Sequence, residues 1–222
     1  MNYFDYSVSI VIPTYNRKKF EKLIEYNINS QDYSNIKEII ILDDSDKDDP
    51  LCIKTLYPIK YLRVPRVSIG EKRNYGVKVA SSKYICMMDT DDFYNAEYIS
   101  KSIFNLIKED KSISGSADMI VYDKIAYYKQ RCIFLHMLNE ATLVFKKTNN
   151  INFNNNSSNE AVPWLIENIP NIIETEIDDI MCCISHNENT ICKKAWCSPK
   201  YNYIDLNIKY ENHLKILSTI RI

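Results

Sequence analysis

The first hundred residues alternate short apolar runs with amphipathic stretches, and this alternation limits the possible fold more than any other feature. The runs have the composition of strands buried on both faces of a parallel sheet. The stretches between them place apolar side chains at helical spacing. Strands are predicted at Ser7–Pro13, Glu38–Leu42, Ile59–Val64 and Lys83–Met88, and helices at Lys18–Asn29, Glu71–Ala80 and Asn95–Lys108. The sequence therefore predicts an α/β fold with a mostly parallel central sheet.

The second half of the chain has a less regular pattern. It predicts a smaller antiparallel portion, then a polar, Asn-rich loop, one or two helical turns, a strand and a closing helix. The ranges are Asp118–Tyr128 and Ile133–Phe145 for the antiparallel strands, Lys146–Asn159 for the loop, Ala161–Glu167 for the turns, Ile180–Ser185 for the strand and Asn207–Ile220 for the helix. No internal repeat or linker is evident, so we expect one domain over residues 1–222.

Composition excludes several classes of protein. The chain has 222 residues, 45% of them hydrophobic, which is enough for a sizeable core and excludes wholesale disorder. A net charge of −1 argues against nucleic-acid binding through bulk electrostatics. No apolar run approaches the roughly 20 residues of a membrane span, and the start of the chain lacks the pattern of a signal peptide. We therefore expect a cytoplasmic protein, or one in the host cytoplasm or virion if a large DNA virus encodes it.

The seven cysteines predict reduced thiols, because an odd number in a chain without a leader does not indicate a disulfide framework. Cys192 and Cys197 have the wrong spacing for a zinc site, and no second pair accompanies them.

Acidic residues follow two of the predicted strands. Asp43–Asp46 follows the second strand and Asp89–Asp92 the fourth, and the carboxyl ends of parallel strands form the ligand-binding edge of such a sheet. Asp89 and Asp91 are two residues apart, so in an extended segment both point to the same side. Carboxylate oxygens suit Mg²⁺ or Mn²⁺, which typically also bind substrate phosphates. The alternative is that Asp89 and Asp92 only cap the next helix, at Asn95.

Other candidates in this region also have two interpretations. Asp43 and Asp44 form either an acidic turn or part of a ligand site. Tyr15 is either a surface aromatic or a face on which a base stacks. Lys72 and Arg73 lie either on a solvated helix face or beside a diphosphate.

Four blocks of sequence together resemble family 2 glycosyltransferases of the GT-A fold, a Rossmann-like nucleotide-diphospho-sugar transferase fold. The blocks occur in the order and at the intervals usual for the family, and the resemblance continues through EATLVFKK (140–147) and ISHNENT (184–190). The four blocks are SIVIPTYNR (9–17), IIILDDS (39–45), IGEKRNYG (69–76) and YICMMDTDDFY (84–94). The resemblance implies that residues 1–94 form the nucleotide-sugar-binding half and residues 95–222 the acceptor-side half.

The resemblance also implies roles for single residues. A nucleoside-diphosphate sugar would be held by Pro13, Thr14, Tyr15, Arg17, Asp43, Asp44, Lys72, Arg73, Asn74, Asp89 and Thr90. Asp89-Thr90-Asp91 corresponds to the family's Asp-x-Asp motif, in which Asp91 would bind Mn²⁺ or Mg²⁺ directly and Asp89 would approach the ribose or the metal. His186 would reach the metal or the diphosphate. Its alternative is a hydrogen-bonded turn histidine, and His136 and His213 are interpreted as structural.

The catalytic base is where this sequence departs from the family pattern. Family members usually have an acidic pair followed by a bulky apolar pair, whereas this chain has Asn159-Glu160-Ala161 at that place. Ala161 replaces the second acid, so Glu160 is the predicted base if the loop register shifts by one residue. The alternative for Glu160 is a solvated first helical turn. Asp178 and Asp179 are weaker candidates.

The predicted function is metal-dependent, inverting transfer of a sugar, with UDP as the default nucleotide, to a hydroxyl of a glycan, lipid or protein. The sequence allows three other interpretations. A catalytically degenerate nucleotide-sugar- or glycan-binding module is favoured only by Ala161. A nucleotidyltransferase normally has a Gly-rich first loop, which PTYNR (13–17) is not, and an aspartate-nucleophile phosphatase carries its motif on the first strand.

Overall fold

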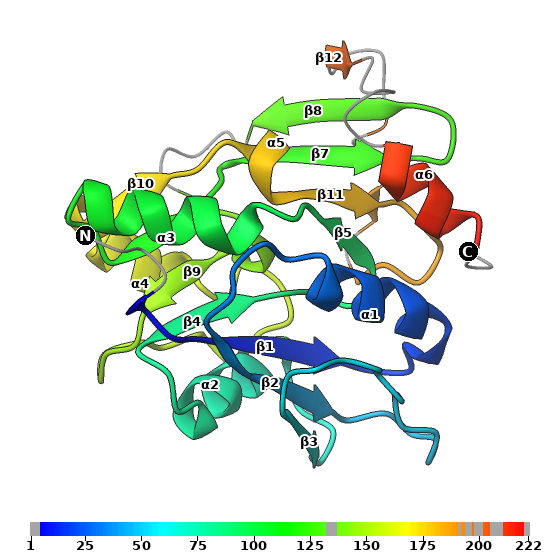
Figure 1. Ribbon diagram of the computed structural model, residues 1–222, viewed down its shortest axis with the longest axis horizontal. Coiled ribbons are helices and arrows are strands. Elements are labelled where there is room, and N and C mark those ends of the chain that lie inside the picture. Colours follow the sequence, from blue (N-terminus) through cyan, green and yellow to red (C-terminus); the bar gives the residue numbers. More distant parts are fainter. Residues whose placement is uncertain are drawn as a thin grey trace.

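The computed structural model describes residues 5–131, 137–190, 192–193, 197, 202–204 and 211–219, and these residues form two β-sheets with helices packed against them (Figure 1). The strand order is β10-β6-β9-β4-β1-β2-β3 in the larger sheet and β12-β8-β7-β11-β5 in the smaller one. The larger sheet contains β1 (Val8–Thr14), β2 (Ile36–Asp43), β3 (Ile59–Arg63), β4 (Tyr84–Met87), β6 (Ile113–Gly115), β9 (Val144–Lys146) and β10 (Ile172–Glu174). The smaller sheet contains β5 (Asp92–Tyr94), β7 (Asp118–Tyr122), β8 (Tyr127–Arg131), β11 (Met181–Ile184) and β12 (Asn202–Ile204).

The helices of the described residues are α-helices and short 3₁₀ turns. They are η2 (Lys18–Phe20), α1 (Glu21–Asn29), α2 (Ile69–Val79), α3 (Tyr98–Lys108), η3 (Glu140–Thr142), α4 (Val162–Glu167), η4 (Ile169–Asn171), α5 (Ile177–Ile180) and α6 (Glu211–Leu217).

The predicted parallel sheet of the first half is confirmed. Strand β1 pairs in parallel with β2 and β4, and β2 pairs in parallel with β3. Strands from the second half extend this sheet beyond β4, because β9 lies antiparallel to both β4 and β6. The carboxyl ends of β1, β2 and β4 therefore lie together at one edge, as a ligand site of this fold requires.

Alternation of side chains along β1 separates the core into two layers. Ile10 and Ile12 pack with α1 and α3, whereas Val11 packs with α2 and α4 on the opposite face. This follows from the two-residue period of a strand, which sends neighbouring side chains to opposite faces. The helices thus cover both faces of the sheet, which explains why the strands are apolar throughout.

The strand predicted over Asp118–Tyr128 is wrong, because that segment is a hairpin of β7 and β8. The Asp123 carboxylate accepts hydrogen bonds from the backbone N–H groups of Ile125 and Ala126, each 2.9 Å long. Lys124 has a φ of 81°, which reverses the chain. An Asp that bonds backbone groups two and three residues ahead is a turn signal that the apolar pattern around it conceals.

The strand predicted over Ile133–Phe145 is also wrong for the residues that the structure describes. Asn139 caps the 3₁₀ turn η3 with its side-chain oxygen on the N–H of Ala141, and only β9 remains as a strand. Residues 132–136, with His136, lie outside the described residues. The closing helix predicted over Asn207–Ile220 is described only as α6, while β5, β6, β10 and α5 are short elements that the sequence pattern did not predict.

The polar loop before α4 is fixed to the start of α2. Ser68 and Glu71 cap α2 reciprocally, and the N–H of Gly70 bonds the carbonyl of Asn156. A Cβ at Gly70 would lie 1.8 Å from the carbonyl oxygen of Asn154, so only glycine permits this approach. The contact places the segment that carries Glu160 beside α2. No helix in the described part of the chain is long and apolar enough to cross a membrane.

Candidate active site

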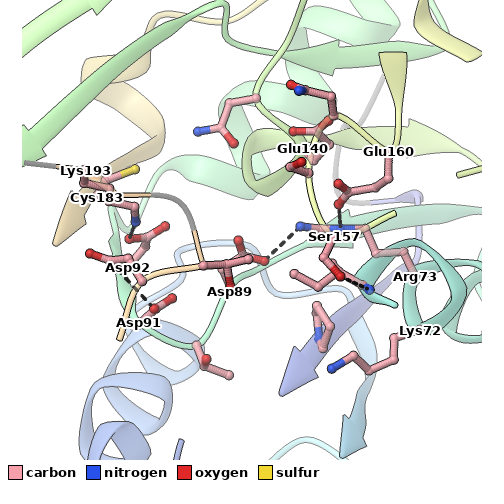
Figure 2. Close-up of a pocket in the computed structure, with 18 of the residues that line it drawn as sticks. Lys72, Arg73, Asp89, Asp91, Asp92, Glu140, Ser157, Glu160, Cys183 and Lys193 are labelled. Atoms are coloured by element: carbon pink, nitrogen blue, oxygen red, sulfur yellow. Dashed lines mark hydrogen bonds and ion pairs between the residues drawn. The ribbon is translucent and has the colours of Figure 1, made fainter. Parts of the chain in front are cut away.

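A pocket of about 510 Å³ opens at the carboxyl ends of β1 and β4, beside the first turns of α2. Figure 2 shows residues from four separate segments facing this space: Lys72 and Arg73 on α2, Asp89 after β4, Glu140 on η3 and Glu160 before α4. Most of the residues singled out in the sequence line it, namely Pro13, Thr14, Tyr15, Arg17, Lys72, Arg73, Asp89, Thr90, Asp91 and Glu160. Asp43, Asp44, Asn74 and His186 do not line it.

Arg73 links the two sides of the pocket. Its Nε donates to Glu160 Oε1 at 2.8 Å and its Nη2 to Asp89 Oδ1 at 3.0 Å (Figure 2). Burial alone would lower the pKa of Arg73, but the negative charges of Asp89 and Glu160 raise it, so the guanidinium stays charged. Its Nη1 is buried and has no hydrogen-bond partner among the described residues, and neither has the hydroxyl of Thr14. Two pocket residues thus carry polar atoms that a ligand would satisfy.

Asp44 lies behind the pocket wall. Its carboxylate accepts from Lys72 Nζ at 2.7 Å, from Arg66 at 2.9 Å and from the N–H of Val67 at 3.2 Å. Burial lowers the pKa of Lys72 despite this pairing. Lys72 also donates to the carbonyl of Thr14 at 3.1 Å, which ties α2 to the end of β1. Protein donors therefore occupy the Asp44 oxygens in this arrangement.

Arg66 covers Tyr15. The guanidinium carbon lies 3.5 Å from the centre of the Tyr15 ring, and the Tyr15 hydroxyl donates to Asp46 at 2.6 Å. Both residues line the pocket and a second cavity next to it. A base that stacks on this face of Tyr15 must displace Arg66.

Two predicted donor-binding residues have structural contacts instead of a place in the pocket. Asp43 accepts hydrogen bonds from the hydroxyls of Ser45 and Tyr61 and from Arg63, and it lines the second cavity. Burial alone would raise its pKa, but these donors outweigh burial and lower it. The amide of Asn74 bonds both the carbonyl and the N–H of Phe153, so it holds the polar loop.

Asp91 and His186 form a hydrogen-bonded pair. His186 Nε2 lies 2.9 Å from Asp91 Oδ2, which also lies 3.5 Å from Arg17 Nη2. The N–H of Glu188 donates to His186 Nδ1 at 3.2 Å, so Nε2 carries the proton and donates to Asp91. Burial alone would raise the pKa of Asp91, but His186, Lys193 and Arg17 outweigh burial and hold it well below its usual range. Both ring nitrogens of His186 are thus engaged with protein partners.

Asp92 and Lys193 form a second buried pair. Lys193 Nζ lies 2.7 Å from Asp92 Oδ1, which also accepts from the N–H of Ile184 (Figure 2). Burial alone would lower the pKa of Lys193, but the charge of Asp92 raises it. Asp92 therefore holds the turn after β4, and it brings a cation to the pocket wall.

A metal ion fits this site only together with a ligand. Among the residues that the structure describes, no three His, Cys, Asp or Glu side chains are arranged to hold a metal. Mg²⁺ and Mn²⁺ often bind through one or two carboxylates plus substrate phosphates and water. Asp89 offers such a carboxylate, since its side chain is 31% exposed. Asp91 lies two residues further along the chain, and its contacts with the described residues involve Oδ2 alone. These residues suit an ion that arrives with a diphosphate.

Sequence reasoning missed Arg66, Glu140 and Lys193, all of which line the pocket. Arg66 stands three residues before α2 and Lys193 just after the His186 block, so each adjoins a recognised motif. Glu140 begins the block EATLVFKK (140–147) that resembles the family, but the block assigned it no role, and it stands within a range predicted as strand. The weaker base candidates Asp178 and Asp179 lie on α5 and do not line the pocket. His213 is buried, and its Nδ1 lies 2.9 Å from the Tyr127 hydroxyl oxygen.

The fold is that of GT-A glycosyltransferases. A crystal structure of S. aureus TarS residues 1–349 superposes with a TM-score of 0.63 and 17% identity, over 81% of this chain and 60% of that one. The structure of the same TarS fragment in complex with UDP-GlcNAc gives a TM-score of 0.61 and 16% identity over 96% of this chain and 66% of that one. These similarities confirm the predicted fold.

The family model described as glycosyl transferase family 2 matches residues 9–159, and the chain belongs to this family. The minor teichoic acid biosynthesis protein GgaB of Bacillus subtilis is 33% identical over 116 residues, which are 49% of this chain and 13% of that protein. The poly(ribitol-phosphate) β-glucosyltransferase of Bacillus spizizenii is 32% identical over 117 residues, which are 47% of this chain and 18% of that protein. The chain thus spans less than a fifth of the length of these two relatives.

Proposed function

We propose that the chain transfers a sugar, with inversion, from a nucleoside-diphosphate sugar to an acceptor hydroxyl, and that UDP is the nucleotide. The observation that carries this proposal is the cationic wall of the pocket, in which Arg73 keeps a buried N–H group that has no partner among the described residues, beside the Asp89 carboxylate. Membership of glycosyl transferase family 2 supports it. So do the structures of TarS in complex with UDP and with UDP-GlcNAc.

The diphosphate of the donor would lie against the cations of the pocket. Arg73 and Lys72 come from the first turns of α2, whose N-terminus adds a favourable dipole. In the transition state negative charge builds on the departing diphosphate, and fixed cations in a partly buried site stabilise that charge. Lys193 reaches the same pocket from the opposite side.

We propose Asp89 and Asp91 as the residues that would hold Mg²⁺ or Mn²⁺ together with the diphosphate. When bound, the ion supplies electrostatic stabilisation of the leaving group. His186 would then orient Asp91 through the hydrogen bond between them, because second contacts of this kind fix the geometry of metal ligands.

The sugar acceptor would enter on the side of Glu140 and Glu160. That part of the pocket is also lined by Ala117, Met119, Met137 and Leu138, which give it apolar surface. The acceptor is a glycan, lipid or protein hydroxyl. The names of the relatives make a glycan or polyol chain the first choice.

A nucleotide-sugar-binding module without catalysis is the second candidate. One observation favours it: the second acid of the family pattern is Ala161, which is fully buried at the start of α4. Binding of a donor without turnover would support this candidate.

A thermal-shift panel of UDP, GDP, CDP and dTDP, each with and without Mn²⁺, tests the proposal. A ligand at about 100 times its Kd stabilises a protein by about 2.7 kcal/mol. We expect a shift with UDP that Mn²⁺ increases and that Asp89→Asn abolishes, whereas Glu97→Gln on the exposed end of α3 keeps it. Absence of a shift with every nucleotide contradicts the proposal.

A further inference from the structure

Ala161 removes one carboxylate from the acceptor side of the pocket, and two others remain there. Glu160 precedes Ala161 directly, and Glu140 approaches from η3. The N–H of Ala161 lies 3.4 Å from Glu140 Oε1, so the two segments are joined at the position where the acid is missing.

Glu160 is poorly suited to accept a proton from a substrate. Its side chain is only 3% exposed, and Oε1 accepts the charge-assisted hydrogen bond from Arg73. Protonation of Glu160 would leave the buried Arg73 guanidinium with Asp89 as its one remaining carboxylate partner. Loss of a partner from a buried ion pair is costly, so Glu160 is engaged with Arg73 and is not free to act on a substrate.

Glu140 has the opposite environment. It is half-buried, lines the pocket and forms no ion pair within 4.0 Å among the described residues. The charged groups that face it are Glu160 from the segment before α4 and Arg73 from α2, with Asp89 on the far side of Arg73. Figure 2 shows Glu140 and Glu160 next to one another on the same side of the pocket.

These surroundings favour proton uptake by Glu140. Burial and the negative charge of Glu160 outweigh the attraction of Arg73 and raise the pKa of Glu140 to about 7. A general base acts best when its pKa lies near the working pH, because it is then both ionised and sufficiently basic.

We propose that Glu140 is the catalytic base and that Glu160 is a positioning residue that holds Arg73. The inference rests on the proposed glycosyl transfer. The acceptor oxygen forms a bond to the anomeric carbon while the bond from that carbon to the diphosphate oxygen breaks, and its electron pair leaves with the nucleoside diphosphate. The proton of the acceptor hydroxyl moves to a carboxylate oxygen of Glu140 and from there to solvent. A base of this kind contributes about 10²–10⁴-fold to the rate.

Donor hydrolysis, with water as acceptor, tests this assignment without knowledge of the natural acceptor. The probes are UDP-GlcNAc and UDP-glucose, and the variants are Glu140→Gln, Glu160→Gln and the double variant Glu140→Gln/Ala161→Asp. We expect Glu140→Gln to lower kcat by about 10²-fold or more while it keeps the UDP-induced thermal shift. Ala161→Asp in the double variant restores a carboxylate at the family position and is expected to recover part of the rate.

Two readouts separate a base from a structural residue. Azide attacks the anomeric carbon without a proton to lose, so Glu140→Gln is expected to form the glycosyl azide at close to the wild-type rate. The wild-type kcat is expected to rise with pH through about 7, and this pH-dependent rise is expected to disappear in Glu140→Gln. Glu160→Gln is expected to weaken UDP binding and to retain the rise of kcat with pH.

The possible failures are distinguishable. Hydrolysis by Glu140→Gln at the wild-type rate, or loss of azide transfer together with hydrolysis, overturns the assignment to Glu140 and leaves the donor site intact. A wild-type protein that binds UDP but turns over neither donor at any pH also overturns it and favours the nucleotide-sugar-binding module without catalysis, because no base is then in use. A wild-type protein that binds no nucleotide contradicts the proposed function itself.

Discussion

Arg73 Nε donates a 2.8 Å hydrogen bond to Glu160 Oε1 across a sequence separation of 87 residues, and both side chains are 3% exposed. This contact joins α2 to the segment before α4, and thereby joins two sides of the pocket. Removal of one member of a buried pair leaves the other charge without compensation.

We therefore predict that Glu160 becomes destabilising when Arg73 is removed. Arg73→Ala is expected to lower the free energy of unfolding by about 3–5 kcal/mol. Glu160→Gln added to Arg73→Ala is expected to recover part of this loss, and urea unfolding of the four proteins in the cycle measures the coupling. Strictly additive effects of the two substitutions would contradict a direct interaction. Lys78→Ala on the exposed side of α2 is the matched control.

Local sequence patterns are sufficient for the first half of the fold. Strands β1, β2 and β4 are apolar because helices cover both faces of the sheet, and this produces a signal within each strand. The acidic clusters can be recognised in the sequence for a related reason, because they directly follow those strands. The edge at which Asp89 and Lys72 line one pocket could thus be predicted from order along the chain.

Contacts between distant segments leave no such signal. Nothing near Glu160 in the sequence indicates that Arg73 is its partner. Glu140 begins a block that resembles the family, but the block does not indicate that this side chain lines the pocket. The turn at Asp123 escaped prediction because apolar residues on both sides continue the pattern of a single strand. These features depend on tertiary packing, which overrides local preference.

The contact between Arg66 and Tyr15 predicts competition with a bound base. Because Arg66 covers the Tyr15 ring at 3.5 Å, Arg66→Ala is expected to increase the affinity for uridine. The increase would be up to about fivefold, equivalent to an exposed cation–π interaction of about 1 kcal/mol. Titration calorimetry with uridine, which carries no phosphate, isolates the base from the diphosphate. A decrease in affinity would mean that Arg66 contacts the base, and Tyr15→Leu tests whether the ring is needed at all.

Glu38 is predicted to make stability depend on acidic pH. Burial alone would raise its pKa, but hydrogen bonds from Ser81, Ser9 and Lys60 outweigh burial and lower it to about 2. A carboxyl with a lowered pKa in the folded state stabilises the protein fully above its ordinary pKa of 4.5, and the contribution disappears as pH falls through about 2.

Glu38→Gln is therefore expected to lower the free energy of unfolding by about 1–3 kcal/mol at neutral pH. The difference in the free energy of unfolding between Glu38→Gln and the wild type is expected to become smaller as the pH is lowered. Thermal unfolding at a series of pH values measures it, with Glu97→Gln at an exposed position as control. A difference that stays constant down to pH of about 2 would contradict this account.

Gly70 is predicted to control how the polar loop docks on α2. A Cβ at this position would lie 1.8 Å from the Asn154 carbonyl oxygen, which belongs to the backbone and cannot rotate away. Gly70→Ala is therefore expected to cost about 1–3 kcal/mol of stability, the range for overpacking, although alanine is the better helix former. Because the same loop leads to Glu160, we also expect weaker UDP binding, measured as a smaller thermal shift. A Gly70→Ala protein with higher stability and unchanged UDP binding would mean that the loop does not rest on α2 in solution.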